Sequence, residues 1–492
     1  MSPVLLHRVR TAADRPLADV RVSGGVVTEI GTGLDRSGEP VIDCAGGFLL
    51  PGFVDGHLHM AQWALSRRRI DVTSAASASE TVDAVVAAVR SGGPMSTGVV
   101  RAQGFRGAMW DEQPHKDMLE SALPGRRVAI TSMDLHTAWL SPSLLSDLGI
   151  DDPTGVFRDQ YAIEVCSGID DRIDNDLLDS YILDSTDVLA AQGVTGVIDF
   201  EYDDNAAAWT RRIAHRRPSV RVSASTWPVW LDEALELGRR TGDVVPGTDG
   251  LLRVGPLKVM ADGSLNTRTA CCHDPYPDSE DGEEHGLLLV EFAELVELIT
   301  KARAGGLAPA VHAIGDRANT IVLDAFEAAA STTPGTGGRI EHAQQLRPED
   351  VKRFARAGVV ASVQPQHCVT DRDVADALWA GRRSIAFPYG SLHASGADLQ
   401  FGSDAPVSPP NPRAAIADAV WRTDDGRPPW TASESLPLDV AIRAACGGRA
   451  SVEVGSVADL VVLAENPRDL GNSDLRNVPI VATVADGRLT YS

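Results

Sequence analysis

From residue 193 onward, short apolar segments typical of β-strands alternate with longer segments of helical periodicity. The strand-like segments span residues 193–200, 219–226, 254–263, 307–315, 338–344, 359–366 and 399–407. The segment FVDGH (53–57) adds an eighth strand. Eight strands, most of them followed by a helix, are the order that closes a parallel (β/α)8 TIM-like barrel of the α/β class. A doubly wound sheet has a similar pattern, but the positions of polar residues, described below, favour the barrel.

The two ends of the chain also have strand-like patterns. The segment LADVRVSGGVVTEIG carries two β-branched runs around Gly24-Gly25, which predicts a hairpin, and residues 455–491 hold two or more further strands. Neither end is large enough to bury a core alone. We therefore expect residues 1–48 and 447–492 to form one small β-sandwich beside a barrel domain of residues 49–446. Two unrelated additions are the alternative.

Residues 60–192 are too long for one barrel helix. They contain helical stretches, strand-like pieces and the tryptophans Trp63, Trp110 and Trp139. We interpret this block as a large insertion after the first strand. Loops that follow barrel strands lie at the catalytic end of the barrel, so the insertion is a candidate lid and substrate wall.

Composition excludes several classes of protein. The chain has 45 Lys and Arg against 68 Asp and Glu, a formal charge of −23, which disfavours nucleic acid and anionic membranes as partners. Neither a run of about 18 apolar residues nor a secretory signal pattern is found, so we expect a cytoplasmic protein. The six cysteines have no CxxC spacing, which argues against disulfides and zinc fingers. A homodimer is the prior expectation for such a protein.

Polar residues stand where the barrel strands end. His57 and His59 follow the first strand, and four others end the fourth, fifth, sixth and eighth strands: Lys258, His312, His342 and Asp404. Each alone would be explained as a hydrogen-bonded core residue. Together, four imidazoles, a carboxylate and a lysine at the catalytic end of a barrel predict a metal site.

The ligand types indicate the metal. Imidazole with carboxylate suits one or two divalent ions, zinc first, with manganese, iron or cobalt as alternatives. An ammonium group cannot bind a cation, but a buried Lys258 with a lowered pKa could take up carbon dioxide and become a carbamate that bridges two ions. A salt bridge from Lys258 to Asp404 or Asp262 is the alternative.

These motifs resemble the amidohydrolase superfamily over nearly the whole chain. The resemblance rests on PGFVDGHLHM, the fourth-strand lysine, VHAIGDRAN, RIEHAQ, SDAPV and GSVADLVVL; the segments MWDE, DLHTAW, KVMADGSLNTRTA and SVQPQH are similar to the branch that contains N-substituted formamide deformylase. It implies a distorted barrel with a small β-sandwich. It also implies metal held by His57, His59, His312, His342 and Asp404 and by a carboxylated Lys258. The segment LNT (265–267) and the acidic loop 273–285 depart from the family pattern, on the substrate side.

Further residues outside the predicted metal site are candidates for substrate contact. The family comparison puts His136 and His367 near the substrate, and Trp110, like Trp139, could wall the pocket. The alternatives are solvated histidines and a tryptophan in the insertion's own core.

The sequence therefore predicts a metal-dependent hydrolase of a C–N bond, most simply an amide, in a small-molecule substrate. The metal would activate water, and Asp404 would bind the metal, accept the water's proton and return it to the leaving nitrogen. Hydrolysis of a cyclic amide or ester, or deamination, is the alternative at the same site. A non-catalytic metal-binding or scaffold protein is the alternative of another class.

Overall fold

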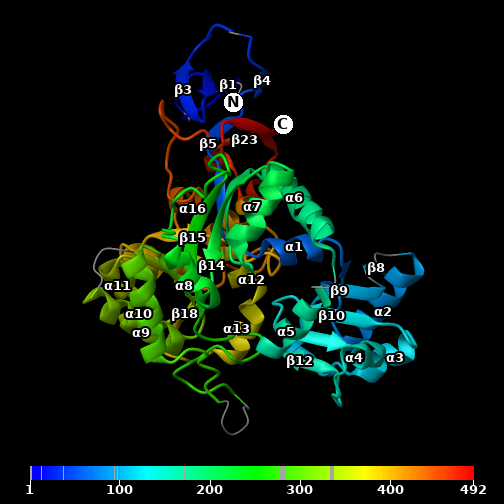
Figure 1. The fold of residues 1–492 in the computed structure, drawn as a ribbon. Helices are drawn as coiled ribbons and strands as arrows, with labels where there is room; N and C mark the ends of the chain where they lie inside the picture. Colours follow the sequence, from blue (N-terminus) through cyan, green and yellow to red (C-terminus); the bar gives the residue numbers. More distant parts are fainter. Residues whose placement is uncertain are drawn as a thin grey trace.

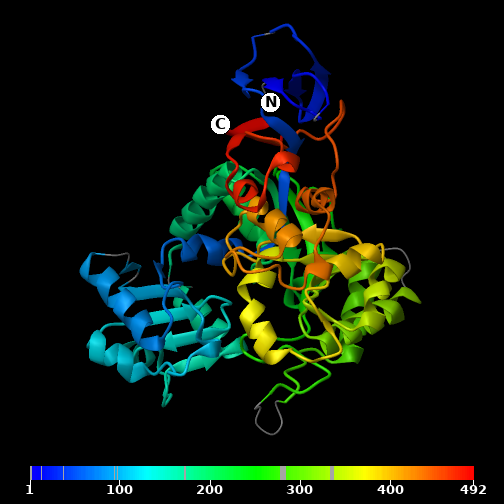
Figure 2. The ribbon, with the colours of Figure 1, turned by 180° about the vertical axis from the view of Figure 1, so that it is seen from behind.

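The computed structural model describes residues 3–12, 14–36, 38–92, 95–96, 98–170, 173–277, 284–332 and 337–492. A central barrel carries the β-sheet of both chain ends at one end and a separate α/β lobe at its side (Figures 1 and 2).

The barrel is one sheet of eight parallel strands, in the order β21-β19-β17-β16-β15-β14-β13-β6. Every strand expected from the sequence is present: β6 (Phe53–Leu58), β13 (Val194–Asp199), β14 (Arg221–Thr226), β15 (Leu252–Met260), β16 (Pro309–Ala313), β17 (Gly338–His342), β19 (Val359–Val363) and β21 (Leu399–Phe401). The predicted α/β barrel is confirmed.

Helices cover the outside of the barrel and bury the apolar residues of the strands in one large core. They are α7 (Asn205–His215), α8 (Leu231–Glu236), α9 (Phe292–Gly305), α10 (Asp316–Ala330), α11 (Pro348–Ala357), α14 (Tyr389–Ala394), α15 (Pro412–Trp421), α16 (Leu438–Ala445) and α17 (Asn472–Asn477). Two short helices, α12 (Pro365–Thr370) and α13 (Arg372–Leu378), follow β19, and the two-residue strands β18 (Gln345–Leu346) and β20 (Ile385–Ala386) pair outside the barrel.

The barrel closes between its last and first strands. Strand β21 has only three residues, shorter than the predicted segment 399–407, and the chain after it runs beside β6. The backbone N–H of Asp404 donates to the carbonyl of His57 at 2.7 Å, and Leu58 forms an isolated parallel bridge with Ala405. This closure brings two widely separated motifs together.

Both chain ends contribute to a sandwich of two four-stranded sheets. One sheet holds β1 (Val4–Val9), β2 (Ala18–Ser23), β3 (Val26–Gly31) and β4 (Val41–Asp43); the other holds β5 (Phe48–Pro51), β22 (Leu460–Leu463), β23 (Ile480–Ala485) and β24 (Arg488–Tyr491). Apolar residues from both sheets form one cluster. The backbone N–H of Gly52, just before β6, donates to the carbonyl of Asp459, so the sandwich lies at the start of the barrel strands. The exact boundaries at 48 and 447 stay a prediction.

The insertion after β6 folds as a lobe around a mixed sheet ordered β12-β11-β10-β9-β7, with β8 on β9. Its strands are β7 (Ile70–Asp71), β8 (Met95–Ser96), β9 (Val99–Phe105), β10 (Val128–Ser132), β11 (Thr137–Leu140) and β12 (Val156–Arg158); its helices are α2 (Ala78–Arg90), α3 (Lys116–Ala122), α4 (Pro142–Leu148) and α5 (Asp159–Asp170). Helices α1 (Met60–Ser66) and α6 (Asn175–Ala191) contact each other and connect the lobe to the barrel.

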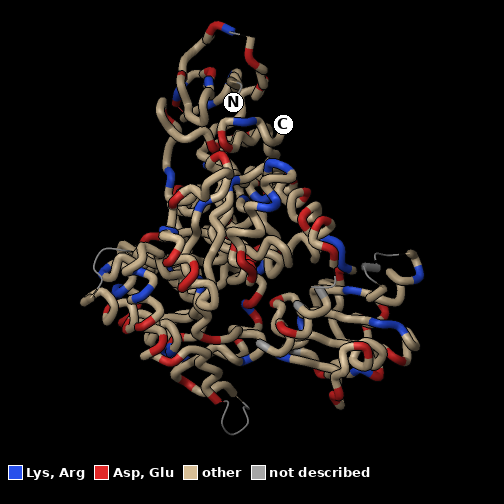
Figure 3. Tube along the Cα trace, in the orientation of Figure 1, with Lys and Arg blue, Asp and Glu red and all other residues tan. Residues whose placement is uncertain are grey.

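Acidic residues outnumber basic ones in this chain, 68 to 45. Acidic positions are spread over the sandwich, the barrel and the lobe, as Figure 3 shows. All six cysteines are free thiols, as expected from their spacing. None of the helices in the described part of the chain is long and apolar enough to cross a membrane.

Candidate active site

His57, His59 and Asp404 meet where the barrel closes. Asp404 Oδ1 lies 3.4 Å from Nε2 of His57 and 3.4 Å from Nε2 of His59. These three side chains offer ligand atoms that all lie within 4.8 Å of one another. One imidazole comes from inside β6 and the other from the residue before α1, so the two sit at the C-terminal end of the first strand.

Asp404 also belongs to a second group, with His342 and His367, whose ligand atoms lie within the same limit. His342 ends β17, and its ring is stacked with that of His367 at 6.1 Å between centroids. Nδ1 of His342 and Nε2 of His367 are buried and have no hydrogen-bond partner among the described residues. Buried imidazole nitrogens without a partner are costly, and a cation would satisfy them.

The charge state of this cluster suits cation binding. Burial acts to raise the pKa of Asp404, but the surrounding His57, His59 and His342 rings outweigh it and hold that pKa well below its usual range. Burial, reinforced by the Lys258 ammonium, lowers the pKa of His57 to about 4. At neutral pH the site therefore presents an ionised carboxylate and a neutral His57 imidazole, which are the forms that bind metal.

Lys258 is buried inside β15, two residues before the strand ends. Its Nζ lies 3.4 Å from Nε2 of His57 and 4.6 Å from the centre of the Phe200 ring. Among the described residues it has no carboxylate partner within 4.0 Å, so the expected alternative, a salt bridge to Asp404 or Asp262, is not formed. Burial lowers the pKa of Lys258 to about 8, which makes the neutral amine accessible.

His312 is in the cluster but turned toward the loop after β15. Its ring lies 4.4 Å from that of His342, and Nε2 lies 3.2 Å from the carbonyl of Gly263 and 3.4 Å from Asp262 Oδ1. The structure thus places His367, which was expected near the substrate, in a candidate ligand group with Asp404. His312 and Lys258, which were expected to be metal ligands, lie beside the two groups.

Two buried carboxylates that sequence reasoning missed hold this site in place. Glu341 accepts a hydrogen bond from His57 Nδ1 at 2.7 Å and pairs with Arg339. Asp55 accepts from the backbone N–H and the hydroxyl of Ser403, at 2.9 and 2.6 Å. Glu341 precedes His342 directly, which was the available signal, and Asp55 stands two residues before His57.

The lobe brings His136 toward the barrel. His136 Nδ1 lies 3.1 Å from Asp159 Oδ1, and the same oxygen accepts from the hydroxyl of Thr269, in the loop after β15. Trp110 packs against Phe105, and Trp139 is buried in the same cluster, so both contribute to the lobe's own core. Neither Trp110 nor Trp139 is among the residues that line the cavity described next.

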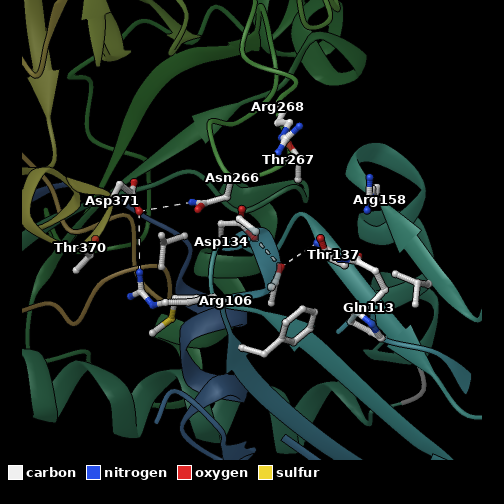
Figure 4. A pocket seen from close by; sticks show the side chains of 18 of the residues that line it. Arg106, Gln113, Asp134, Thr137, Arg158, Asn266, Thr267, Arg268, Thr370 and Asp371 are labelled. Atoms are coloured by element: carbon white, nitrogen blue, oxygen red, sulfur yellow. Dashed lines mark hydrogen bonds and ion pairs between the residues drawn. The ribbon is translucent and has the colours of Figure 1, made fainter. Parts of the chain in front are cut away.

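A cavity of about 530 Å³ lies between the lobe and the barrel (Figure 4). Its lobe wall runs from Phe105 to Arg158, and its barrel wall includes residues 266–268, 370–371 and Val407. Val407 is three residues beyond Asp404, and α12, which carries His367, ends at Thr370. The candidate ligands themselves are not among the residues that line the cavity, but two of them, Asp404 and His367, stand three residues from its wall in sequence. Asn266 and Thr267, which depart from the family pattern, line it, whereas residues 278–283 of the acidic loop lie outside the described residues.

Comparison with known proteins agrees with this architecture. The model of the Amidohydrolase family matches residues 40–491. Protein LONG AFTER FAR-RED 3 of Arabidopsis thaliana is 26% identical over 97% of this chain and 89% of its own length, and N-substituted formamide deformylase of Arthrobacter pascens is 25% identical over 96% and 94%.

Solved structures share the fold. An uncharacterized metal-dependent hydrolase from Pyrococcus horikoshii superposes with a TM-score of 0.76 at 23% identity, covering 96% of this chain and 99% of that one. N-isopropylammelide isopropylaminohydrolase from Burkholderia multivorans gives a TM-score of 0.52 at 15% identity, covering 99% and 98%. With the family model matching most of the sequence, the barrel and its histidine-rich closure identify this chain as a hydrolase of the amidohydrolase family.

Proposed function

We propose that this protein is a metal-dependent hydrolase that cleaves a non-peptide C–N bond, most simply an amide, in a small molecule. The observation that carries the proposal is the convergence of two imidazole groups on one ionised carboxylate, Asp404. The similarity to N-substituted formamide deformylase supports an amide as the bond that is cleaved.

The donor atoms fit a divalent ion, with zinc as the first candidate. His57, His59, His342, His367 and Asp404 supply imidazole nitrogen and carboxylate oxygen, the ligands that borderline ions prefer. The buried nitrogens of His342 and His367 that lack a partner support this assignment. A bound ion supplies a lowered pKa for a water molecule and polarisation of the substrate carbonyl.

Asp404 is the proposed proton carrier. Its carboxylate is ionised at neutral pH and lies beside two histidines, so it is able to accept the proton of the attacking water. The water oxygen forms a bond to the carbonyl carbon, the C–N bond breaks, and Asp404 returns the proton to the leaving nitrogen.

We also propose that Lys258 is carboxylated. Its amine is buried, its lowered pKa leaves a reactive lone pair, and no described carboxylate binds it. Attack of Nζ on carbon dioxide, with loss of a proton, converts the cation into a carbamate whose oxygens are cation ligands.

Elemental analysis and a substrate screen test the proposal together. Protein purified without added metal should hold one to two divalent ions per chain, and the double variant His57→Ala and His59→Ala should hold none. The metal-loaded enzyme should hydrolyse at least one member of a panel of formamides, N-acyl amino acids, cyclic ureides and esters. Absence of metal after reconstitution would overturn the proposal. Cleavage of esters alone would show that the bond cleaved is an ester and not an amide.

A further inference from the structure

The cavity between the lobe and the barrel has two acidic side chains in its wall, and both are engaged by neighbouring protein groups. Asp134 accepts from the hydroxyl of Ser132 at 2.6 Å and from the backbone N–H of His136 at 3.2 Å. Asp371 accepts from Asn266 at 3.5 Å and faces Arg106 at 4.0 Å, as the dashed lines in Figure 4 show. Both carboxylates therefore already face protein groups.

Besides Arg106, the same wall holds two exposed arginines. Arg158 ends β12 in the lobe, and Arg268 stands in the loop after β15; neither pairs with a carboxylate of the described residues. The Arg268 guanidinium donates a hydrogen bond to the carbonyl of Pro277 at 3.4 Å. In a chain with 68 acidic and 45 basic residues, two guanidinium groups in one cavity that have no acidic partner among the described residues run against the overall charge.

Backbone strain is found at Arg268 and at the residue that follows Arg158. Arg268 has φ +62°, and Asp159, which follows Arg158, has φ +50°; both lie in the left-handed region that favours glycine. Such conformations cost about 1–3 kcal/mol each and are concentrated at binding and catalytic sites. Figure 4 shows the Arg106–Asp371 pair on one side of the cavity and Arg158 and Arg268 on the other.

The rest of the wall is suited to an organic molecule. Phe105, Met133, Val156 and Val407 supply apolar surface, and Thr137 and Thr267 lie near the two arginines in Figure 4. A volume of about 530 Å³ accommodates a small organic ligand rather than a simple ion. The planar guanidinium group matches a carboxylate through two parallel hydrogen bonds.

We propose that this cavity binds the carboxylate of the substrate, through Arg158 from the lobe and Arg268 from the barrel, while the amide lies at the candidate metal ligands. This inference rests on the proposed function and narrows it: the substrate is an amide whose amine part carries a carboxylate and an apolar side chain. The lobe then selects the substrate, since one of the two arginines belongs to it.

Binding of matched acid and ester probes tests the charge requirement. N-formylphenylalanine, as both enantiomers, and its methyl ester differ only in the carboxylate, and calorimetry with the chelator-treated full-length protein should show the acid binding about 10- to 100-fold more tightly. Arg158→Gln and Arg268→Gln should each reduce this preference about tenfold, and Arg158→Lys should reduce it less. Arg90→Gln, an exposed change in the same lobe, is the matched control.

The outcomes separate this inference from the proposed function. Equal binding of acid and ester, no binding of either, or a preference that survives in the folded Arg158→Gln and Arg268→Gln double variant would overturn the carboxylate site. Thermal unfolding of each variant identifies misfolding. If Arg268→Gln does not fold, the acid preference of Arg158→Gln alone decides whether the carboxylate site exists. If the metal-loaded enzyme cleaves the amide bond of the methyl ester as efficiently as that of the acid, the proposed amide hydrolysis stands and the carboxylate site is refuted. If the acid binds selectively but neither compound nor any other amide is cleaved, the carboxylate site stands and the proposed amide hydrolysis is refuted.

Discussion

Glu341 Oε2 lies 2.7 Å from His57 Nδ1, and neither side chain is accessible to solvent. The Arg339 guanidinium, His57 and Lys258 outweigh burial and hold the pKa of Glu341 far below its usual range, so the carboxylate is ionised and can only accept. Nδ1 of His57 must then carry the proton. Nε2 is left with its lone pair, and it faces Asp404. A carboxylate behind a histidine ligand fixes the tautomer and the ring orientation.

Replacing Glu341 by Gln should therefore weaken metal binding without removing a ligand. The amide keeps the shape of the side chain but no longer favours the Nδ1–H tautomer, and loss of such partners lowers metal affinity about 10- to 100-fold. Competition with a chelator measures the change. Glu349→Gln, on a half-exposed carboxylate that pairs with Arg347 and Arg383, is the control. Unchanged affinity in the Glu341 variant would show that His57 is oriented by other contacts.

The sequence was sufficient to predict the barrel strands because each is an apolar run followed by turn residues or a helix. The signal for Glu341 was its position beside His342, but neighbouring strand residues normally point to opposite faces, so the pattern did not place both side chains in one site. His342 and Ala343 have φ +74° and +45°, and this change of backbone conformation lets His342 join the cluster next to Glu341. Likewise, the grouping of His367 with Asp404 depends on α12, whose direction no local pattern encodes.

Gly402 tests how tightly the barrel closure is packed around His57. A methyl group at this position would stand 2.6 Å from both Cβ and the backbone nitrogen of His57. Gly402→Ala should lower the free energy of unfolding by about 1–3 kcal/mol, as overpacking does, and should also weaken metal binding. Thermal unfolding and metal analysis measure the two effects.

Gly168→Ala is the matched control for that substitution. Gly168 lies in α5, and among the described residues its added methyl group would meet no atom within 4 Å outside the backbone of its own helix. Because alanine is favoured over glycine in a helix by about 1 kcal/mol, this variant should be as stable as the parent or slightly more so. A Gly402→Ala protein of parental stability and metal content would mean that the closure adjusts without cost.

Lys258→Ala should lose most activity and regain part of it with formate or propionate. A small carboxylate can occupy the space of the carbamate and offer equivalent oxygens, whereas it cannot replace an ammonium group. Intact mass measured in bicarbonate should show one added carbon dioxide on the parent protein and none on the variant. Lys352→Ala, at an exposed lysine, should behave as the parent. An unmodified Lys258 together with no chemical rescue would refute carboxylation and leave the histidine and aspartate ligands in place.

Asp404→Asn separates proton transfer from metal binding. The amide keeps the size of the side chain and one oxygen for the cation, but it cannot accept the proton of the attacking water. Loss of a general base lowers the rate about 10²- to 10⁴-fold, so kcat should fall by that factor while the four imidazoles retain most of the metal. Steady-state kinetics and elemental analysis on the same preparation measure both, with Asp398→Asn, an exposed carboxylate before β21, as the control. If the variant holds metal and keeps a near-parental kcat, another group accepts the proton. His136 is then the first to replace, because Asp159 holds its ring at the boundary between the lobe and the barrel.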